Sequence, residues 1–283
     1  MTTSRIPVIF VHGLWIHSSA WEPWIEKFRS VGLQPVAPGW PGDHETVAET
    51  RAQPEQLAGV GLESIAAHYS NIIDAMDQPP IVIGHSIGGL VTQKLNVSRT
   101  LRAAVAIDPA PIKDVRPAPL AQLRSSFPVL RNPGNANRTV ALSAQQFRYA
   151  FGNMVSVLES DALRARYAIP GPGRPIFEVA TANLRRSSPA AVDIRTEDRA
   201  PLLIVSGESD HTVPDVVARA AHRLYRNSPV VADLLPMSGR GHSLVLDDGW
   251  QDLADRILVW LSEKVEQLPA TTPDVNTRSS QSD

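Results

Sequence analysis

The stretch PIVIGHSIGG, residues 80–89, decides the fold of this chain. It opens with an apolar, β-branched run that is typical of a strand buried on both faces of a parallel sheet, and a helical run follows to Val97. Between them lies the pattern G-x-S-x-G, centred on Ser86, which predicts a sharp strand-to-helix turn that exposes the serine hydroxyl above the sheet. At the start of the helix, the Ile87 N–H is expected to point to where an oxyanion would form.

Other apolar runs alternate with helical patterns along most of the chain. The predicted strands cover residues 7–12, 33–37, 80–84, 103–107, 201–205 and 230–235. The predicted helices cover residues 20–31, 62–76, 90–97, 214–225 and 250–265. Such alternation indicates βαβ units, so we expect an α/β fold with a mostly parallel sheet and helices on both faces.

The alternation stops between the fourth and fifth predicted strands. Residues 111–199 contain nine prolines, short helical patterns near 143–155 and 159–167, and no clear strand. We therefore expect a helical cap, inserted between the two parts of an α/β core at 1–110 and 200–268. The tail at 269–283 is rich in Thr, Ser, Asp and Pro, a composition that predicts disorder.

Ser86 needs a base to become a nucleophile, and the base needs a carboxylate to orient it. Asp210 directly follows the fifth predicted strand, and His242 lies on a glycine-flanked loop after the sixth. The carboxyl ends of parallel strands share one edge of a sheet, so both side chains are expected near Ser86. Asp108, at the end of the fourth strand, is the alternative acid.

A second loop at the same edge follows the first strand, where His12, Gly13, Leu14 and Trp15 stand in sequence. A glycine there lets the chain turn so that the Leu14 N–H faces the serine as a second oxyanion donor. Several large side chains are predicted to line the substrate pocket, with plain core packing as the alternative. They are Trp15, Trp40, Phe127, Phe147, Phe151 and Met154.

Composition narrows the classes of function. The chain has 283 residues, a net charge of −2 and no cysteine, which excludes disulfides, thiolate metal sites and cysteine nucleophiles. We expect no metal and no cofactor. The near-neutral charge argues against nucleic acid or an anionic membrane as partner. No signal peptide and no window of about 18 apolar residues is present, so a cytoplasmic protein is expected.

Taken together, six segments resemble the α/β-hydrolase superfamily, and in particular esterase-like serine hydrolases with a helical cap. They are VIFVHGLW (8–15), the tryptophan-bearing helix predicted after it at 20–31, VIGHSIGG (82–89), AIDPAP (106–111), LLIVSGESDHTVP (202–214) and SGRGHS (238–243). The resemblance implies Ser86 as nucleophile, His242 as general base and Asp210 as orienting acid. It also implies Leu14 and Ile87 as oxyanion donors, in a sheet of about six strands. The loop HGLW differs from the HGGG of many lipases, so the resemblance does not support the cleavage of bulky tertiary esters.

These features predict a serine hydrolase that cleaves a carboxylic ester, lactone or related acyl compound through an acyl-enzyme on Ser86. Alternatives with the same three residues are a cofactor-free perhydrolase or haloperoxidase, a C–C bond hydrolase, or a small-molecule receptor. Dehalogenase and epoxide hydrolase chemistry is disfavoured because both need an aspartate where this chain has Ser86. The expected partner is an apolar small-molecule acyl substrate, whose identity depends on the insertion and the loops.

Overall fold

A six-stranded parallel sheet forms the centre of the molecule, as the alternating sequence pattern predicts. The structure, a computed structural model, describes residues 5–266 and 268. The strands are β1 (Pro7–Val11), β2 (Gln34–Val36), β3 (Ile81–His85), β4 (Ala103–Ile107), β7 (Leu202–Gly207) and β8 (Ala232–Met237). Their order is β2-β1-β3-β4-β7-β8, and every neighbouring pair is parallel. The predicted α/β fold class is therefore confirmed.

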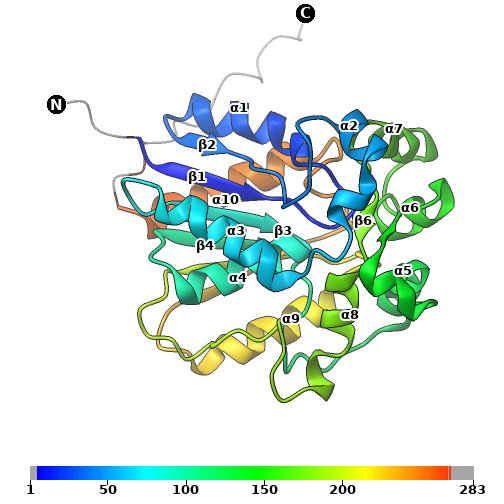
Figure 1. Cartoon of the computed structure of the whole chain (residues 1–283). Helices are drawn as coiled ribbons and strands as arrows, with labels where there is room; N and C mark the ends of the chain where they lie inside the picture. The colour runs from blue at the N-terminus through cyan, green and yellow to red at the C-terminus, as the bar shows by residue number, and fades with distance from the viewer. Residues whose placement is uncertain (1–4, 267, 269–283) are drawn as a thin grey trace, which may run out of the picture.

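Helices cover both faces of this sheet, which explains why its central strands β1, β3, β4 and β7 are buried at every position. One face of β1, with Val8 and Phe10, packs with α1 (Glu22–Ser30) and α10 (Trp250–Lys264). The other face, with Ile9 and Val11, packs under a second set of helices (Figure 1). That set is α3 (Leu62–Asp74), α4 (Ile87–Ser98) and α9 (Asp215–Leu224). No helix of the described residues is long and apolar enough to cross a membrane.

Short helical segments connect these layers. They are η1 (Ser18–Trp21), α2 (Val47–Ala52), η2 (Pro54–Leu57) and η5 (Tyr225–Asn227). The sequence gives no clear pattern for residues 43–61, where α2 begins at a local capping box. The Thr46 hydroxyl accepts from the Glu49 N–H, and the Glu49 carboxylate accepts from the Thr46 N–H.

The helices of the segment inserted between β4 and β7 gather at one end of the sheet, where they are drawn in green in Figure 1. Its elements are α5 (Leu120–Leu130), η3 (Pro133–Asn137), β5 (Thr139–Val140), α6 (Ala144–Ala150), α7 (Val157–Tyr167), β6 (Gly171–Pro172), α8 (Arg174–Ala180) and η4 (Ala182–Leu184). The expectation of no strand here is wrong, because β5 and β6 pair antiparallel. Strands of two residues are too short to produce an alternating pattern. The predicted tail at 269–283 lies outside the described residues.

The chain changes direction across the sheet between β1 and β3. β2 lies on one side of β1, and the chain then crosses to place β3 on the other side. The loops after β1 and β3 consequently lie at a topological switch point, where α/β sheets leave a crevice at the carboxyl ends of their strands. The inserted segment holds the first of these loops, since the Ile169 N–H donates to the Trp15 carbonyl at 2.9 Å.

Candidate active site

Ser86 occupies the turn between β3 and α4 in a conformation that few non-glycine residues adopt. Its φ is 57° and its ψ is −120°, and its N–H donates to the Ile107 carbonyl of β4 at 2.9 Å. A Cβ at Gly84 would collide with the Gly88 carbonyl, and one at Gly88 would collide with the Val11 carbonyl of β1. The two glycines therefore allow the close packing that holds the serine in this strained position.

His242 joins Ser86 to Asp210 through two hydrogen bonds. The His242 Nδ1 atom lies 2.6 Å from Asp210 Oδ2, and its Nε2 atom lies 3.0 Å from the Ser86 Oγ. A carboxylate only accepts, so Nδ1 carries the proton and Nε2 is left to accept from the serine hydroxyl. All three side chains are buried, which shields the pair of hydrogen bonds from bulk water.

The structure brings Asp210, rather than the alternative Asp108, into hydrogen-bonding contact with His242. The loop after β7 fixes the carboxylate, because Asp210 Oδ1 accepts the N–H groups of Thr212 and Val213 at 2.6 and 2.9 Å. The Asp108 carboxyl is buried beside this pair and accepts the Gly207 N–H at 2.6 Å through Oδ1. Burial, followed by the nearby charge of Asp210, raises the pKa of Asp108 well above its ordinary value.

Two rings enclose the imidazole of His242. His85 lies 4.5 Å away between ring centroids, and Phe151 lies 4.9 Å away in an edge-to-face arrangement. Burial lowers the pKa of His85 well below its ordinary value, and the proximity of His242 lowers it further. His85 is therefore neutral at neutral pH and adds no charge beside the base. The sequence predicts neither ring as a neighbour of His242.

The loop after β1 presents a free N–H beside Ser86. Leu14 has no acceptor for its N–H among the described residues, and its side chain lines the same cavity as Ser86 and Ile87. Ile87 is the first residue of α4, so its N–H has no acceptor within the helix. Trp15 adopts φ 67° and donates its indole N–H to the Val140 carbonyl at 2.9 Å, which ties the loop to the inserted segment.

The other side of this loop is held by a buried acid that the sequence gives no means to predict. His12 Nε2 lies 2.9 Å from Asp43 Oδ2, and the Trp40 N–H donates to the same oxygen at 2.9 Å. The two ends of the loop at Gly13 and Leu14 are thus fixed by separate contacts. Leu14 and Ile87, whose N–H groups have no acceptor among the described residues, therefore lie in two segments that line the same cavity as Ser86.

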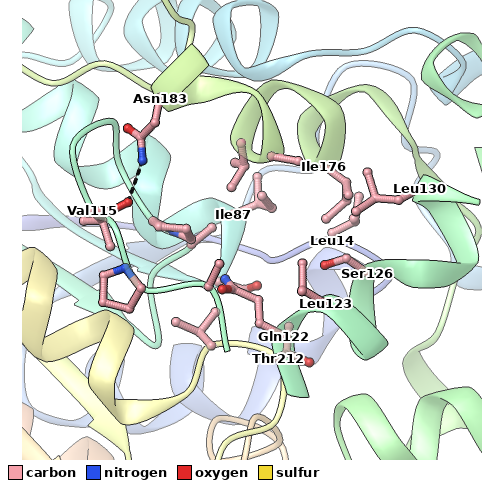
Figure 2. Close-up of a pocket in the computed structure, with 18 of the residues that line it drawn as sticks. Leu14, Ile87, Val115, Gln122, Leu123, Ser126, Leu130, Ile176, Asn183 and Thr212 are labelled. Atoms are coloured by element: carbon pink, nitrogen blue, oxygen red, sulfur yellow. Dashed lines mark hydrogen bonds between the residues drawn. The ribbon is translucent and has the colours of Figure 1, made fainter. Parts of the chain in front are cut away.

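A cavity of about 170 Å³ opens beside Ser86. Figure 2 shows Leu123, Ser126 and Leu130 of α5 around the cavity that Leu14 and Ile87 also line. The amide of Asn183 donates to the Val115 carbonyl at 2.8 Å, which closes another part of the wall (Figure 2). The lining also includes Trp15, Ala110, Pro111, Arg116, Pro117, Ala118, Gln122, Ile176, Val179, Ala180, Thr212 and Val213. Most of the wall is apolar and comes from the inserted segment.

The predicted pocket residues divide between this cavity and other places. Trp15 lines the cavity, whereas the other five do not, so the prediction is corrected for Trp40, Phe127, Phe147, Phe151 and Met154. Trp40 is buried against the ring of His12, and Phe147 and Phe151 are buried and stacked on each other. Phe127 and Met154 are exposed. Aromatic side chains give the same sequence signal in a core as in a pocket wall, which is why the pattern misassigns them.

Among residues 5–266 and 268, three side chains stand close enough to suggest a metal site: His85, Asp108 and His242. One ligand atom from each lies within 4.8 Å of the other two. Both ring nitrogens of His242 already bond Asp210 and Ser86, so a metal ion there would have to displace one of these contacts. The arrangement fits a proton-transfer site better than a metal centre.

The parallel sheet, the strained serine turn and the serine–imidazole–carboxylate contact define the class of α/β-hydrolase proteins. The chain belongs to the alpha/beta hydrolase family, which its sequence matches over residues 8–256. A search of curated proteins finds no match to the sequence.

Solved structures share the fold at low sequence identity. A monoacylglycerol lipase from Paleococcus ferrophilus is 20% identical, with 91% of this chain and 94% of that chain covered and a TM-score of 0.63. An esterase from Thermogutta terrifontis is 16% identical, with 93% and 92% covered and a TM-score of 0.66. BpoC from Mycobacterium tuberculosis, whose proposed activity is that of a non-heme bromoperoxidase, is 18% identical, with 92% and 93% covered and a TM-score of 0.66. At these identities the likeness concerns the fold alone.

Proposed function

We propose that the protein is a serine hydrolase that cleaves a carboxylic ester, lactone or related acyl compound through an acyl-enzyme on Ser86. The observation that carries this proposal is the continuous contact from Asp210 through His242 to the Ser86 hydroxyl, buried beside an open cavity. A hydroxyl is a weak nucleophile near neutral pH unless a positioned base removes its proton. Membership of the alpha/beta hydrolase family supports the proposal that the protein is a hydrolase.

The geometry supports the following course of reaction. The Ser86 Oγ attacks the substrate carbonyl carbon while His242 Nε2 takes the hydroxyl proton. Asp210 holds the ring in the correct tautomer and stabilises the imidazolium that forms. The N–H groups of Leu14 and Ile87 hold the negative oxygen, and each donor of this kind is worth about 10²–10³ in rate.

Collapse of the tetrahedral intermediate breaks the bond to the leaving alcohol, which receives the proton from His242. An acyl group then remains on the Ser86 oxygen. Water attacks this acyl-enzyme with His242 again accepting a proton, and the acid product leaves as the Ser86 hydroxyl is restored. The same base serves both halves of the reaction, so no metal or cofactor takes part in the proposed steps.

The cavity supports an apolar substrate group. Leu123, Leu130 and Ile176 supply aliphatic walls, while Gln122 and Ser126 offer hydrogen bonds on one side. Arg116 is the one charged side chain among the lining residues. An apolar acyl or alcohol group of medium size therefore fits better than a highly charged one.

The proposal is tested with a p-nitrophenyl ester series of increasing acyl length and a panel of lactones. The Ser86→Ala variant should lose turnover by roughly 10³-fold or more while remaining folded. Ser30→Ala is the matched control, because it removes an exposed serine hydroxyl of α1 that lies outside the cavity. It should keep most of the activity.

Two results would count against the proposal. If Ser86→Ala retains turnover, the nucleophile lies elsewhere. If the wild-type protein reacts with a fluorophosphonate at Ser86 but turns over no ester or lactone, a binding function gains support. A peroxide-dependent bromination assay in acetate separates water from peroxide as the second nucleophile.

A further inference from the structure

A second buried carboxyl lies beside Asp210, and the proposed mechanism does not use it. Asp108 directly follows β4 with φ 40°, and its N–H donates to the Val205 carbonyl of β7 at 3.0 Å. The Gly207 N–H donates to Asp108 Oδ1, whereas no N–H or O–H donor from the described residues reaches Oδ2. A fully buried carboxyl oxygen without a hydrogen-bond donor raises the free energy of the folded state.

The sheet register brings the two acids together. β4 and β7 are parallel neighbours with Ile107, the last residue of β4, level with Val205, so Asp108 lies beside the last residues of β7 at the carboxyl edge of the sheet. The loop after β7 turns back at once, since the Asp210 N–H donates to the Gly207 carbonyl at 3.2 Å. The carboxyl of Asp210 consequently lies at the same edge of the sheet as Asp108, and its charge raises the pKa of Asp108.

The Asp108 carboxyl also lies near His242, the proposed general base. One Asp108 oxygen is within 4.8 Å of a ring nitrogen of His242 and of one of His85. The charged and titratable groups that face Asp108 are Asp210, His242, His85 and the guanidinium of Arg240. Arg240 is bonded to Asp247 and to the Gly249 carbonyl, so it does not pair directly with either acid.

A second negative charge beside the Asp210 carboxylate is disfavoured in a buried site, so the neighbouring carboxyl holds a proton. The pKa of Asp108 is raised by burial and then by the charge of Asp210, which places that proton on Asp108. Its O–H then supplies the donor that Oδ2 otherwise lacks. Asp210 remains the carboxylate that accepts from His242.

We propose that Asp108 is a second positioning acid, able to take the place of the Asp210 carboxylate as the partner of His242. This inference rests on the proposed function, since it concerns the same base. While Asp210 is present, the O–H of Asp108 donates to it, and the pair carries a single negative charge. When Asp210 is removed, Asp108 gives its proton to solvent and its carboxylate accepts from the Nδ1–H of His242.

A double-mutant cycle tests the proposal, with the rate of Ser86 labelling by a fluorophosphonate and ester turnover as readouts. Asp108→Asn alone keeps an acceptor for the Gly207 N–H and a donor toward Asp210, so a loss below roughly tenfold is expected. Asp210→Ala should retain about 10–100-fold more activity than the double variant Asp210→Ala/Asp108→Asn, because loss of every orienting acid costs about 10⁴ in rate. The matched control is Glu208→Gln in the Asp210→Ala background. It neutralises a nearby exposed acid that pairs with Arg219 and should leave the rate unchanged.

A pH series separates a positioning role from a structural one. The activity ratio of Asp210→Ala to the double variant should rise with pH as Asp108 loses its proton, whereas a packing role would give a constant ratio. If Asp108→Asn lowers activity by the same factor in the wild-type and Asp210→Ala backgrounds, and that factor does not change with pH, Asp108 is not a positioning acid. If the wild-type protein is not labelled at all, the proposed function fails, and this outcome is distinct from failure of the cycle.

Discussion

The substitution Gly13→Ala tests how closely the loop after β1 must approach Ser86. A Cβ on residue 13 would lie 2.9 Å from the Ser86 Cβ and 3.0 Å from the His85 Nδ1. Favourable carbon–carbon contacts begin near about 3.5 Å, so the loop or the serine must move by about 0.6 Å. Gly13 does not have a positive φ, so the effect comes from this contact and not from backbone strain.

The neighbours of Gly13 leave little room for the movement. His12 is held by Asp43, and the Trp15 indole by the Val140 carbonyl, so the shift falls on the Leu14 N–H and on Ser86. A displacement of about 1 Å at reacting groups can cost about 10²-fold in rate. We therefore expect Gly13→Ala to lower kcat by roughly 10- to 100-fold. The overpacking should cost about 1–3 kcal/mol in the free energy of unfolding.

The assay compares kcat on the best ester of the series, the rate of fluorophosphonate labelling and the urea unfolding midpoint. Gly134→Ala is the control, because Gly134 is exposed in η3 and a Cβ there meets only the Asn132 side chain, at 3.2 Å. It should leave kcat unchanged. A folded Gly13→Ala protein with kcat within about twofold of the wild type would refute the reasoning about the loop.

Three further perturbations follow from the packing around the site. Ile176→Ala enlarges the cavity, so kcat/KM for long acyl chains should rise by roughly tenfold relative to kcat/KM for short ones. If the chain-length profile does not change, the acyl group binds elsewhere. Phe147→Ala should cost about 3–5 kcal/mol in urea unfolding without changing that profile, because Phe147 is buried and stacked on Phe151 outside the cavity. The lowered pKa of His85 means that the unfolded chain takes up a proton below about pH 6.5 that the buried ring does not. Wild-type stability should therefore fall as the pH drops below that value, and His85→Phe should weaken this dependence; equal pH slopes for the two proteins would count against a neutral buried His85.

The elements that the sequence predicts best are those whose pattern repeats over many residues. The strand and helix that flank Ser86 are of this kind, and the order of the loops follows from the parallel sheet. The sequence favours Asp210 but leaves Asp108 as an alternative, because the two acids follow neighbouring strands whose carboxyl ends lie at the same edge. The decision depends on the loop after β7, whose N–H groups turn the Asp210 carboxylate toward His242.

The inserted segment shows where sequence patterns fail. Its α5 contains Pro128 and follows Pro119, and its strands have only two residues each, so neither carries a strong periodic signal. The pocket wall depends on which side of a helix faces Ser86. Leu123 and Leu130 of α5 line the cavity, whereas Phe127 of the same helix points to solvent. Such a difference arises from tertiary packing and not from residue type.

The most direct test of the central claim is a mass measurement of the protein after reaction with a fluorophosphonate, followed by peptide mapping. The account predicts a single adduct on the peptide that contains Ser86, and none on the Ser86→Ala protein. Labelling should slow by roughly 10³-fold or more in His242→Ala, because that variant has no base within reach of the hydroxyl. An adduct on another residue, or equal labelling of wild type and His242→Ala, would contradict the account.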